Sequence, residues 1–468
     1  MHCIIELEEI VNRELDVNIL YTLRTIKNIA EKICDETVSE HRELHIEPDD
    51  LNTIVLGIKR YLSIDFPKLI GDFRSLPVQS YYYHRKYRFN IMVHQRIDEK
   101  LDDDSIINAV ISIVKANDIL QVCMLKKGKD IRFKKLNVEV LREKVPIIDV
   151  KYDIDPLYLV ESLKEVGKDL LYESKYKQGI LNAFFAVRSK HSTVLFCMLD
   201  HCIADGASTN ILLQDIGVAL TGHEIRKKLC SYQEYVEHVN KVNETVDLVN
   251  HWYIELLRKF NREDAMVKIN MLKRKGTRIK INNFCQYDAT YASIFMSYYV
   301  GKMLCEKLNI REISQLIILN GREFSKLPIK KTVGDIHISV PIIYYRGEKK
   351  VEFFERIYGV LNDLYFDAEF DPYYYALNNY PIISKQQEGV LYLIKENICV
   401  SSDFMGVLNG KEFESNDSSI FEMQWNLEKG SQKSKIYSTG VVYKNDLYIY
   451  LSREISSVSI TEEYINIE

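Results

Sequence analysis

Residues 193–206 read TVLFCMLDHCIADG, an apolar run that ends abruptly in Asp200 and His201. The run predicts a buried strand, and the small residues that follow predict a tight turn at Gly206, because glycine permits sharp turns and close approach to a ligand. Residues from Ser208 onward can begin a helix. A histidine at a strand end is held on rigid backbone, as a catalytic base must be. The stretch therefore predicts an α/β fold with His201 facing a functional site.

Two other interpretations of His201 start from the same residues. A histidine near the end of a strand is often a hydrogen-bonded residue of the core. A metal site is a further alternative, since Cys197, Cys202 and Asp205 lie close to it in sequence. Alternation along a strand directs the two cysteines to opposite faces, however, so they cannot converge on one ion without a bend. We therefore expect no bound metal.

The composition describes a large globular chain without a strong charge. The 468 residues are 46% hydrophobic, enough to bury a large core and to form two or three domains. The 62 basic and 67 acidic residues are interspersed and give a net charge of −5. Because no long basic block is present, we expect no nucleic-acid partner.

Cysteine spacing and the N-terminal residues indicate the cellular compartment of the protein. The nine cysteines include no Cys-x-x-Cys pair, which favours reduced thiols over a disulfide framework or a zinc knuckle. The first residues lack the charged-then-apolar layout of a signal peptide. The most apolar stretch, 289–304, is broken by serine, tyrosine and lysine residues and reads as a buried amphipathic helix. We expect a cytoplasmic protein that makes no membrane contact.

The chain divides into four segments by pattern. Residues 1–37 have helical apolar spacing, and the polar segment 38–77 reads as a linker. Strands and helices alternate over 78–245, and 246–468 repeats that mixture, ending in a hairpin turned at Asn445 and Asp446. The sequence thus predicts two α/β lobes of similar size.

The spacing His201-x-x-x-Asp205-Gly206 resembles the signature of chloramphenicol-acetyltransferase-like acyltransferases. Within that group the chain most resembles the condensation domains of nonribosomal peptide synthetases. The likeness continues in order: SYQEYVEHVN (231–240) resembles a segment after the active-site helix, residues 288–324 resemble the helix and strand that lead to Arg322, and VGDIHISVPI (333–342) resembles the glycine-to-proline segment. It covers residues 78 to about 460. The resemblance implies two α/β-sandwich lobes that form a V-shaped pseudo-dimer with a central cleft.

The resemblance also implies roles for particular residues. His201 would be the catalytic residue, supported by Asp205, Gly206 and Arg322. Family members direct this aspartate away from the substrate and pair it with the arginine, whereas an Asp–His dyad would make Asp205 orient the imidazole. Ser208 and Ser402 are candidate donors to an oxyanion or to the substrate. His337 falls in the cleft-facing segment, although a solvated or core histidine is the simpler interpretation.

Three departures from the family pattern concern activity. Asp200 stands where condensation domains usually carry a first histidine, Ile338 stands where they carry asparagine, and their later arginine is missing. These differences leave open a degenerate, non-catalytic domain that docks carrier proteins. Residues 1–37 resemble the second half of a carrier domain without its phosphopantetheine-bearing serine, as a boundary inside a larger synthetase would produce. A plain helical extension explains this segment equally well.

The function implied by the resemblance is condensation. The protein would join a carrier-bound acyl or peptidyl thioester to a carrier-bound amine, forming an amide. It would bind no cofactor of its own, and both substrates would arrive on phosphopantetheine arms. The implied partners are acyl or peptidyl carrier domains and the adenylation domains of the same assembly line. A free-standing acyltransferase that uses coenzyme A or a carrier thioester is the alternative enzyme.

Overall fold

The computed structural model describes residues 46–63, 70–86, 88, 90–128, 130–244, 258, 262–273, 276–282, 284, 288–367, 398–407 and 436–454. The helices are α4 (Pro48–Leu62), α5 (Pro77–Arg85), α6 (Asp103–Ala116), α7 (Pro156–Lys177), α8 (Gly206–Leu220), α9 (Tyr232–Asn243), α11 (Arg262–Asn270), α12 (Ala289–Leu308) and α13 (Lys350–Asp367). The strands are β1 (Ile70–Arg74), β2 (Asn90–Ile97), β3 (Val122–Lys127), β4 (Asp130–Lys135), β5 (Ile147–Asp149), β6 (Asn182–Arg188), β7 (Thr193–Asp200), β8 (Thr277–Ile281), β9 (Glu312–Asn320), β10 (His337–Tyr345), β11 (Val400–Val407), β12 (Ile436–Tyr443) and β13 (Asp446–Leu451).

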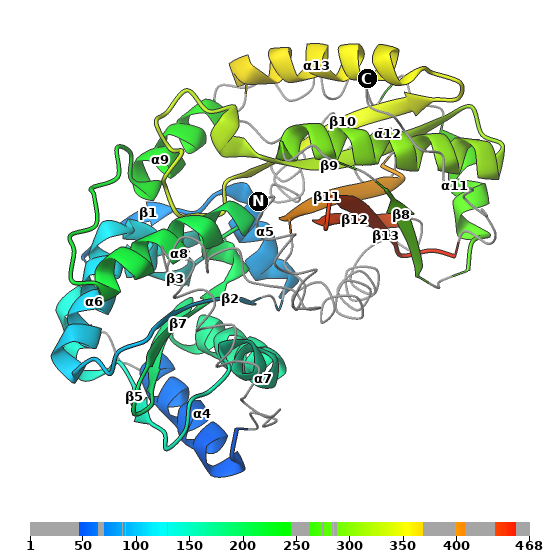
Figure 1. Cartoon of the computed structure of the whole chain (residues 1–468). Helices are drawn as coiled ribbons and strands as arrows, with labels where there is room; N and C mark the ends of the chain where they lie inside the picture. Colours follow the sequence, from blue (N-terminus) through cyan, green and yellow to red (C-terminus); the bar gives the residue numbers. More distant parts are fainter. Residues whose placement is uncertain are drawn as a thin grey trace.

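The described elements form two halves, each with its own core (Figure 1). The first half holds a four-stranded sheet in the order β2-β7-β6-β5 and a three-stranded sheet in the order β1-β4-β3. The second half holds one six-stranded sheet in the order β10-β9-β11-β12-β13-β8. This mixed α/β architecture confirms the predicted fold class. The V shape and the pseudo-symmetry of two equivalent lobes stay predictions.

Strand β7 lies inside the first half. It pairs antiparallel with β2 on one side and with β6 on the other, and all eight of its residues are buried. Helix α7 contacts β2 and β7, and α8 contacts β2. A strand covered on both faces needs apolar side chains on both faces, which explains the continuous apolar run that precedes Asp200. The strand, its hairpin with β6 and the following helix are confirmed.

Segment 38–77 is not the linker that its polar composition predicted. Residues 48–62 form α4, whose apolar face includes Ile54, Ile58 and Leu62 in the core of the first half. Residues 70–74 form β1, which pairs with β4. Most exposed residues of the helix are polar or charged, among them Asp49, Lys59 and Arg60, and this polar face led to the prediction of a linker. Residues 1–37 and the predicted boundary at 245/246 lie outside the described residues.

The second half follows the predicted pattern closely. Helices α12 and α13 and strands β9 and β10 supply the mixture of helices and strands that was predicted there. The hairpin β12–β13 is also present, although its turn lies one residue earlier, at Lys444 and Asn445. Both residues have left-handed backbone angles, with φ of 48° and 63°, as a tight two-residue hairpin turn requires. Among the described helices, none is long and apolar enough to cross a membrane.

Candidate active site at the junction of the two halves

His201 follows β7 directly and opens the short 3-10 helix η3 (His201–Ile203). Asp200 caps this turn, since its side chain accepts a hydrogen bond of 2.9 Å from the backbone N–H of Cys202. His201 is half-buried, and its ring lies edge-on to that of Tyr82 from α5, with 5.7 Å between the ring centroids. The imidazole is therefore fixed by rigid elements while remaining partly accessible.

A buried ion pair lies immediately beside the histidine. The ammonium of Lys175 on α7 donates to Asp200 Oδ2 at 2.7 Å, and the two side chains are 1% and 4% exposed. Burial alone would lower the pKa of Lys175, but the neighbouring Cys202 and Asp200 outweigh it and raise that pKa, so the ammonium stays charged. Asp200 thus serves to anchor the turn that presents His201. The sequence contained no signal for Lys175.

Asp205 ties the two halves together. Its Oδ2 accepts from Nη1 of Arg322, which follows β9 of the second half, at 2.7 Å. It also accepts at 2.9 Å from the backbone N–H of Ile336, which lies in the segment before β10 and whose side chain packs in the core of the first half. Its Oδ1 accepts from the backbone N–H and the hydroxyl of Ser208. The predicted Asp205–Arg322 pair is present, and none of these four hydrogen bonds involves His201. The geometry therefore favours a structural carboxylate over an Asp–His dyad.

Arg322 is saturated with partners of its own. It lies in the 3-10 turn η5 (Gly321–Glu323), is 3% exposed, and donates to the carbonyl oxygens of Thr332 and Gly334 as well as to Asp205. Burial would raise the pKa of Asp205, but the charge and the hydrogen bonds of Arg322 hold it below its ordinary value. Both members of the pair are therefore charged at neutral pH.

Ser208 and Ser402 are both buried. Ser208 is fully buried, and its hydroxyl bridges Asp205, Gly334 and the guanidinium of Arg322. Ser402 is 1% exposed and belongs to the face of β11 that packs toward α12. Ser208 therefore has structural partners, and contact of Ser208 or Ser402 with an oxyanion or the substrate stays a prediction.

Gly206 is the first residue of α8, where Asp205 is the N-cap. It is not among the glycines with a positive φ, so the turn does not require glycine for its backbone angles. A Cβ at this position would meet no atom within 4 Å. Neither the backbone angles nor a close contact therefore explains the glycine at this position.

Asp403 is the residue near His201 that the sequence reading missed. It lies on β11 in the second half and is exposed. Burial by the surrounding protein raises its pKa, and the imidazoles of His337 and His201 act in the opposite direction. Solvent reaches the Asp403 carboxylate, but the surrounding protein disfavours its ionised form. Asp403 therefore lies in a partly enclosed position. The neighbouring Ser402 was predicted as a candidate, and not Asp403.

His337 also lies at this junction. Its Nδ1 is 2.6 Å from Oδ1 of Asp335, a carboxylate that is fully buried. The side chain of His337 is 9% exposed. It therefore fits the interpretation as a hydrogen-bonded core histidine, and Asp335 orients its imidazole.

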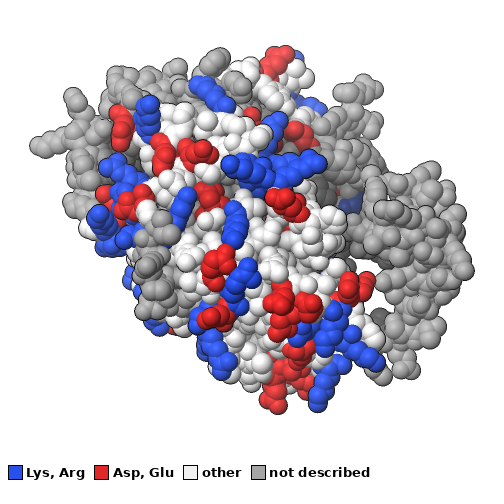
Figure 2. Space-filling view, turned by 90° about the vertical axis from the view of Figure 1, so that its left-hand side faces the viewer, with Lys and Arg blue, Asp and Glu red and all other residues white. Residues whose placement is uncertain are grey.

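The metal alternative gains no support from the thiols. Cys197 and Cys202 are fully buried, and burial raises the pKa of both thiols, which disfavours the thiolate that a metal requires. In the described part of the chain, no group of three or more histidine, cysteine or acidic residues could hold a metal ion. On the face shown in Figure 2, acidic and basic side chains intermingle among the described residues and form no single-sign patch.

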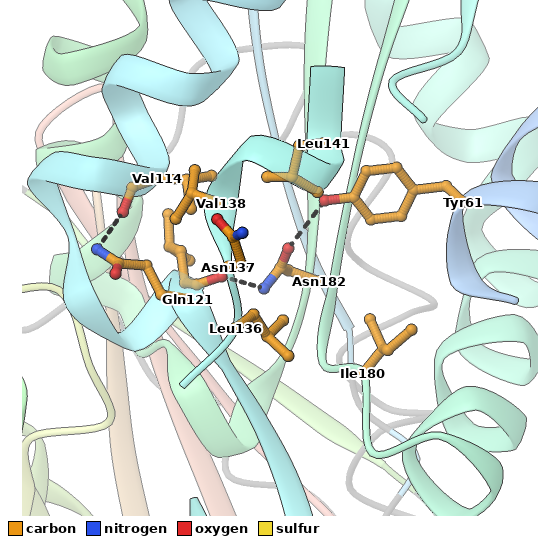
Figure 3. Close-up of a pocket in the computed structure, with 10 residues that line it drawn as sticks. Tyr61, Val114, Gln121, Leu136, Asn137, Val138, Leu141, Ile180 and Asn182 are labelled. Atoms are coloured by element: carbon orange, nitrogen blue, oxygen red, sulfur yellow. Dashed lines mark hydrogen bonds between the residues drawn. The ribbon is translucent and has the colours of Figure 1, made fainter. Parts of the chain in front are cut away.

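A small cavity elsewhere in the first half is separate from this site. Tyr61, Asn182 and Leu141 are among the residues around it, and the side-chain amide of Asn182 joins the Tyr61 hydroxyl to the carbonyl oxygen of Leu120 (Figure 3). The cavity has room for about one water molecule, so it cannot hold an acyl substrate. We assign it no function.

The fold matches solved structures of condensation-type domains. No protein-family model and no curated protein sequence matches the chain. Structural similarity, at 10–14% identity, is nevertheless extensive and covers more than four fifths of the chain in the three comparisons below. The chain therefore has the acyltransferase-like fold of nonribosomal peptide synthetase condensation domains, which confirms the resemblance at the level of the fold.

Three solved structures illustrate this similarity. The epimerization domain from the third module of tyrocidine synthetase B has a TM-score of 0.57 at 14% identity, with 83% of this chain and 92% of that chain covered. The starter condensation domain of the rhizomide synthetase has a TM-score of 0.54 at 10% identity, covering 82% and 90%. A structure that describes condensation domain-mediated chain release from the enacyloxin polyketide synthase has a TM-score of 0.53 at 13% identity, covering 85% and 82%.

Proposed function

We propose that this chain is a condensation-type acyltransferase. It joins a carrier-bound acyl or peptidyl thioester to the amine of a second carrier-bound substrate. The observation that carries the proposal is the position of His201, half-buried at the end of a fully buried strand, where Asp403 of the second half approaches it. Carrier domains, and the adenylation domains that load them, are the proposed partners, and the reduced, buried cysteines fit a cytoplasmic location.

The chemistry needs one proton acceptor and no bound cofactor. The amine nitrogen attacks the thioester carbonyl carbon, a carbon–nitrogen bond forms and the carbon–sulfur bond breaks. His201 takes a proton from the attacking nitrogen and delivers it to the departing thiolate, so protons balance. Histidine suits this step because an imidazole changes protonation near neutral pH. Asp205 acts at a distance by fixing the backbone of both halves around the imidazole.

The test compares wild type with His201→Ala on acyl-carrier donors, with amine and alcohol acceptors presented on a second carrier. Thiol release is the measurement. We expect the variant to lose about 10²- to 10⁴-fold in rate with the alcohol and less with the amine, because an amine of pKa near 8 is already partly neutral. His223→Ala, an exposed histidine on the surface of the first half, is the matched control. Equal losses with both acceptors would contradict the role of His201 as a base during attack.

A non-catalytic, carrier-docking domain is the second candidate. The position of Ile338 favours it, since this residue is 3% exposed and packs in the core beneath α12, where it offers no polar group to a substrate. Carrier binding without thiol release by wild type would support docking alone. Turnover with acyl-coenzyme A donors in place of carriers would instead indicate the free-standing acyltransferase.

A further inference from the structure

One face of the second sheet differs in character from the other. Ile317, Leu319, Ile338 and Val340 belong to the core that α12 completes, and α12 lies along β9 and β10 (Figure 1). The alternate residues of these strands point to the opposite face. At the start of β10 these are His337 and Ser339, so the first four residues, His-Ile-Ser-Val, place polar side chains on one face and apolar side chains on the other. Further along the strand, Pro341 and Ile343 continue the face of His337 and Ser339.

Strand register places Asp403 on this polar face. Asp403 pairs with Ile318 of β9, and Ile318 in turn pairs with Ser339 of β10, so the three residues form one row across the sheet. His337 lies two residues from Ser339 and therefore on the same face. On the other side, Asp403 pairs with Thr439 of β12. The carboxylate thus stands on an interior strand of the sheet, on rigid backbone.

The surroundings of this carboxylate define what it can bind. Asp403 is exposed, yet it interacts electrostatically with the imidazoles of both His201 and His337. It therefore lies near both the candidate catalytic residue of the first half and the imidazole that Asp335 orients in the second. Burial removes the stabilisation that water gives to an ionised carboxylate, and a cationic partner supplies stabilisation in its place. A carboxylate in such surroundings therefore favours binding of a cation.

We propose that Asp403 holds the ammonium group of the acceptor substrate beside His201. The proposal rests on the proposed condensation function and narrows it, since it assigns a charged amine, and not an alcohol, as the acceptor class. An α-amine has a pKa near 8 and is mostly protonated at neutral pH, so a carboxylate recognises it directly. Before attack the ammonium must lose one proton, and the carboxylate that holds it is the adjacent acceptor. Solvent access at Asp403 then lets that proton leave.

The experiment measures binding and does not require turnover. Two unreactive acceptor analogues, alanyl-pantetheine amide and lactyl-pantetheine amide, differ only in carrying an ammonium or a hydroxyl group. Isothermal titration of the full chain at pH 7 gives the affinity of each for wild type and for Asp403→Asn. We expect wild type to bind the alanyl analogue about 10- to 100-fold more tightly, as for a hydrogen bond to a charged group, and Asp403→Asn to abolish this preference while binding the lactyl analogue normally.

The control and the opposing outcomes are equally specific. Asp104→Asn, an exposed aspartate on α6, makes the same chemical change away from the site and should keep the preference. If Asp403→Asn also keeps it, or if wild type binds both analogues equally, the role of Asp403 is refuted while the condensation function stands. If wild type binds neither analogue, both the role of Asp403 and the carrier-bound acceptor are refuted.

Discussion

Replacing Asp205 with asparagine separates a structural role for this carboxylate from a catalytic one. Asparagine keeps the size of the side chain and an oxygen that Ser208 can still contact. The amide NH₂ would then face two donors, Nη1 of Arg322 and the N–H of Ile336, which now donate to Oδ2 at 2.7 and 2.9 Å. Because Arg322 is 3% exposed, its charge would remain buried without a counter-charge.

The expected loss is large. Breaking a buried ion pair by removing one partner costs about 3–5 kcal/mol in the free energy of unfolding. If each half unfolds as a cooperative unit of about 150–250 residues, this corresponds to a drop in Tm of roughly 6–20 °C. Arg322→Met should cost a similar amount, because it leaves Asp205 charged and buried. The double variant should lose less than the sum of the two single losses, since neither charge is then left alone.

The assay is thermal and urea unfolding followed by circular dichroism, with thiol release measured at a temperature where all variants are folded. Arg74→Met is the matched control: its partner is Glu244, the side chains are 59% and 68% exposed, and such a pair contributes about 0–1 kcal/mol. Since the pKa of Asp205 is lowered in the folded state, its contribution is present above the ordinary carboxyl pKa and lost as the pH falls through the lowered one. Asp205→Asn that unfolds like wild type but releases no thiol would refute this reasoning and restore the Asp–His dyad.

Three further changes test other parts of the site. Gly334→Ala should cost about 1–3 kcal/mol or more, because its Cβ would lie 2.1 Å from ring carbons of Tyr232; urea unfolding measures the loss, and an unaffected midpoint would contradict this close contact. Lys175→Met should lower the free energy of unfolding by about 3–5 kcal/mol, because it leaves Asp200 buried and unpaired. Adding Asp200→Asn to this variant should recover part of the lost stability. Equal urea midpoints for the single and the double variant would contradict a stabilising Lys175–Asp200 ion pair. Asp403→Asn should raise the Tm at pH 7.5. The pKa of Asp403 is raised in the folded state, so wild type loses stability as the pH rises above about 3.8, and the difference in Tm between the two proteins should vanish in acid. A lower Tm for Asp403→Asn than for wild type at pH 7.5 would contradict a raised pKa.

The sequence predicted the elements with a strong apolar pattern, but it did not predict helix α4, which lies in a polar segment. The continuous apolar run of β7 identified this strand, because burial on both faces leaves a direct imprint on the sequence pattern. Helix α4 was missed because most of its exposed residues are polar or charged and only an apolar stripe reaches the core. Composition averaged over the segment hid that stripe.

The site was predictable only where one local motif carried it. His201, Asp205 and Gly206 lie within six residues, and the Arg322 pairing came from a family resemblance. Lys175 and Asp403 could not be found in this way, since each reaches the site from a different element and neither stands in a distinctive local pattern. The alternation of His337 and Ser339 with apolar residues was the one available signal that a polar sheet face exists in the second half.

The Asp205 network has a consequence for both imidazoles. Asp205 lies four residues after His201, and through the N–H of Ile336 it also fixes the residue that precedes His337. One carboxylate therefore sets the backbone on both sides of the junction, while the hydroxyl of Tyr232 donates to the carbonyl oxygen of Asp335 and strengthens the same link. Because the imidazoles belong to different halves, any relative movement of the halves would change the distance between them and Asp403. A strong, buried, fully bonded ion pair at this point keeps that distance constant, which is what a site assembled from two separate cores requires.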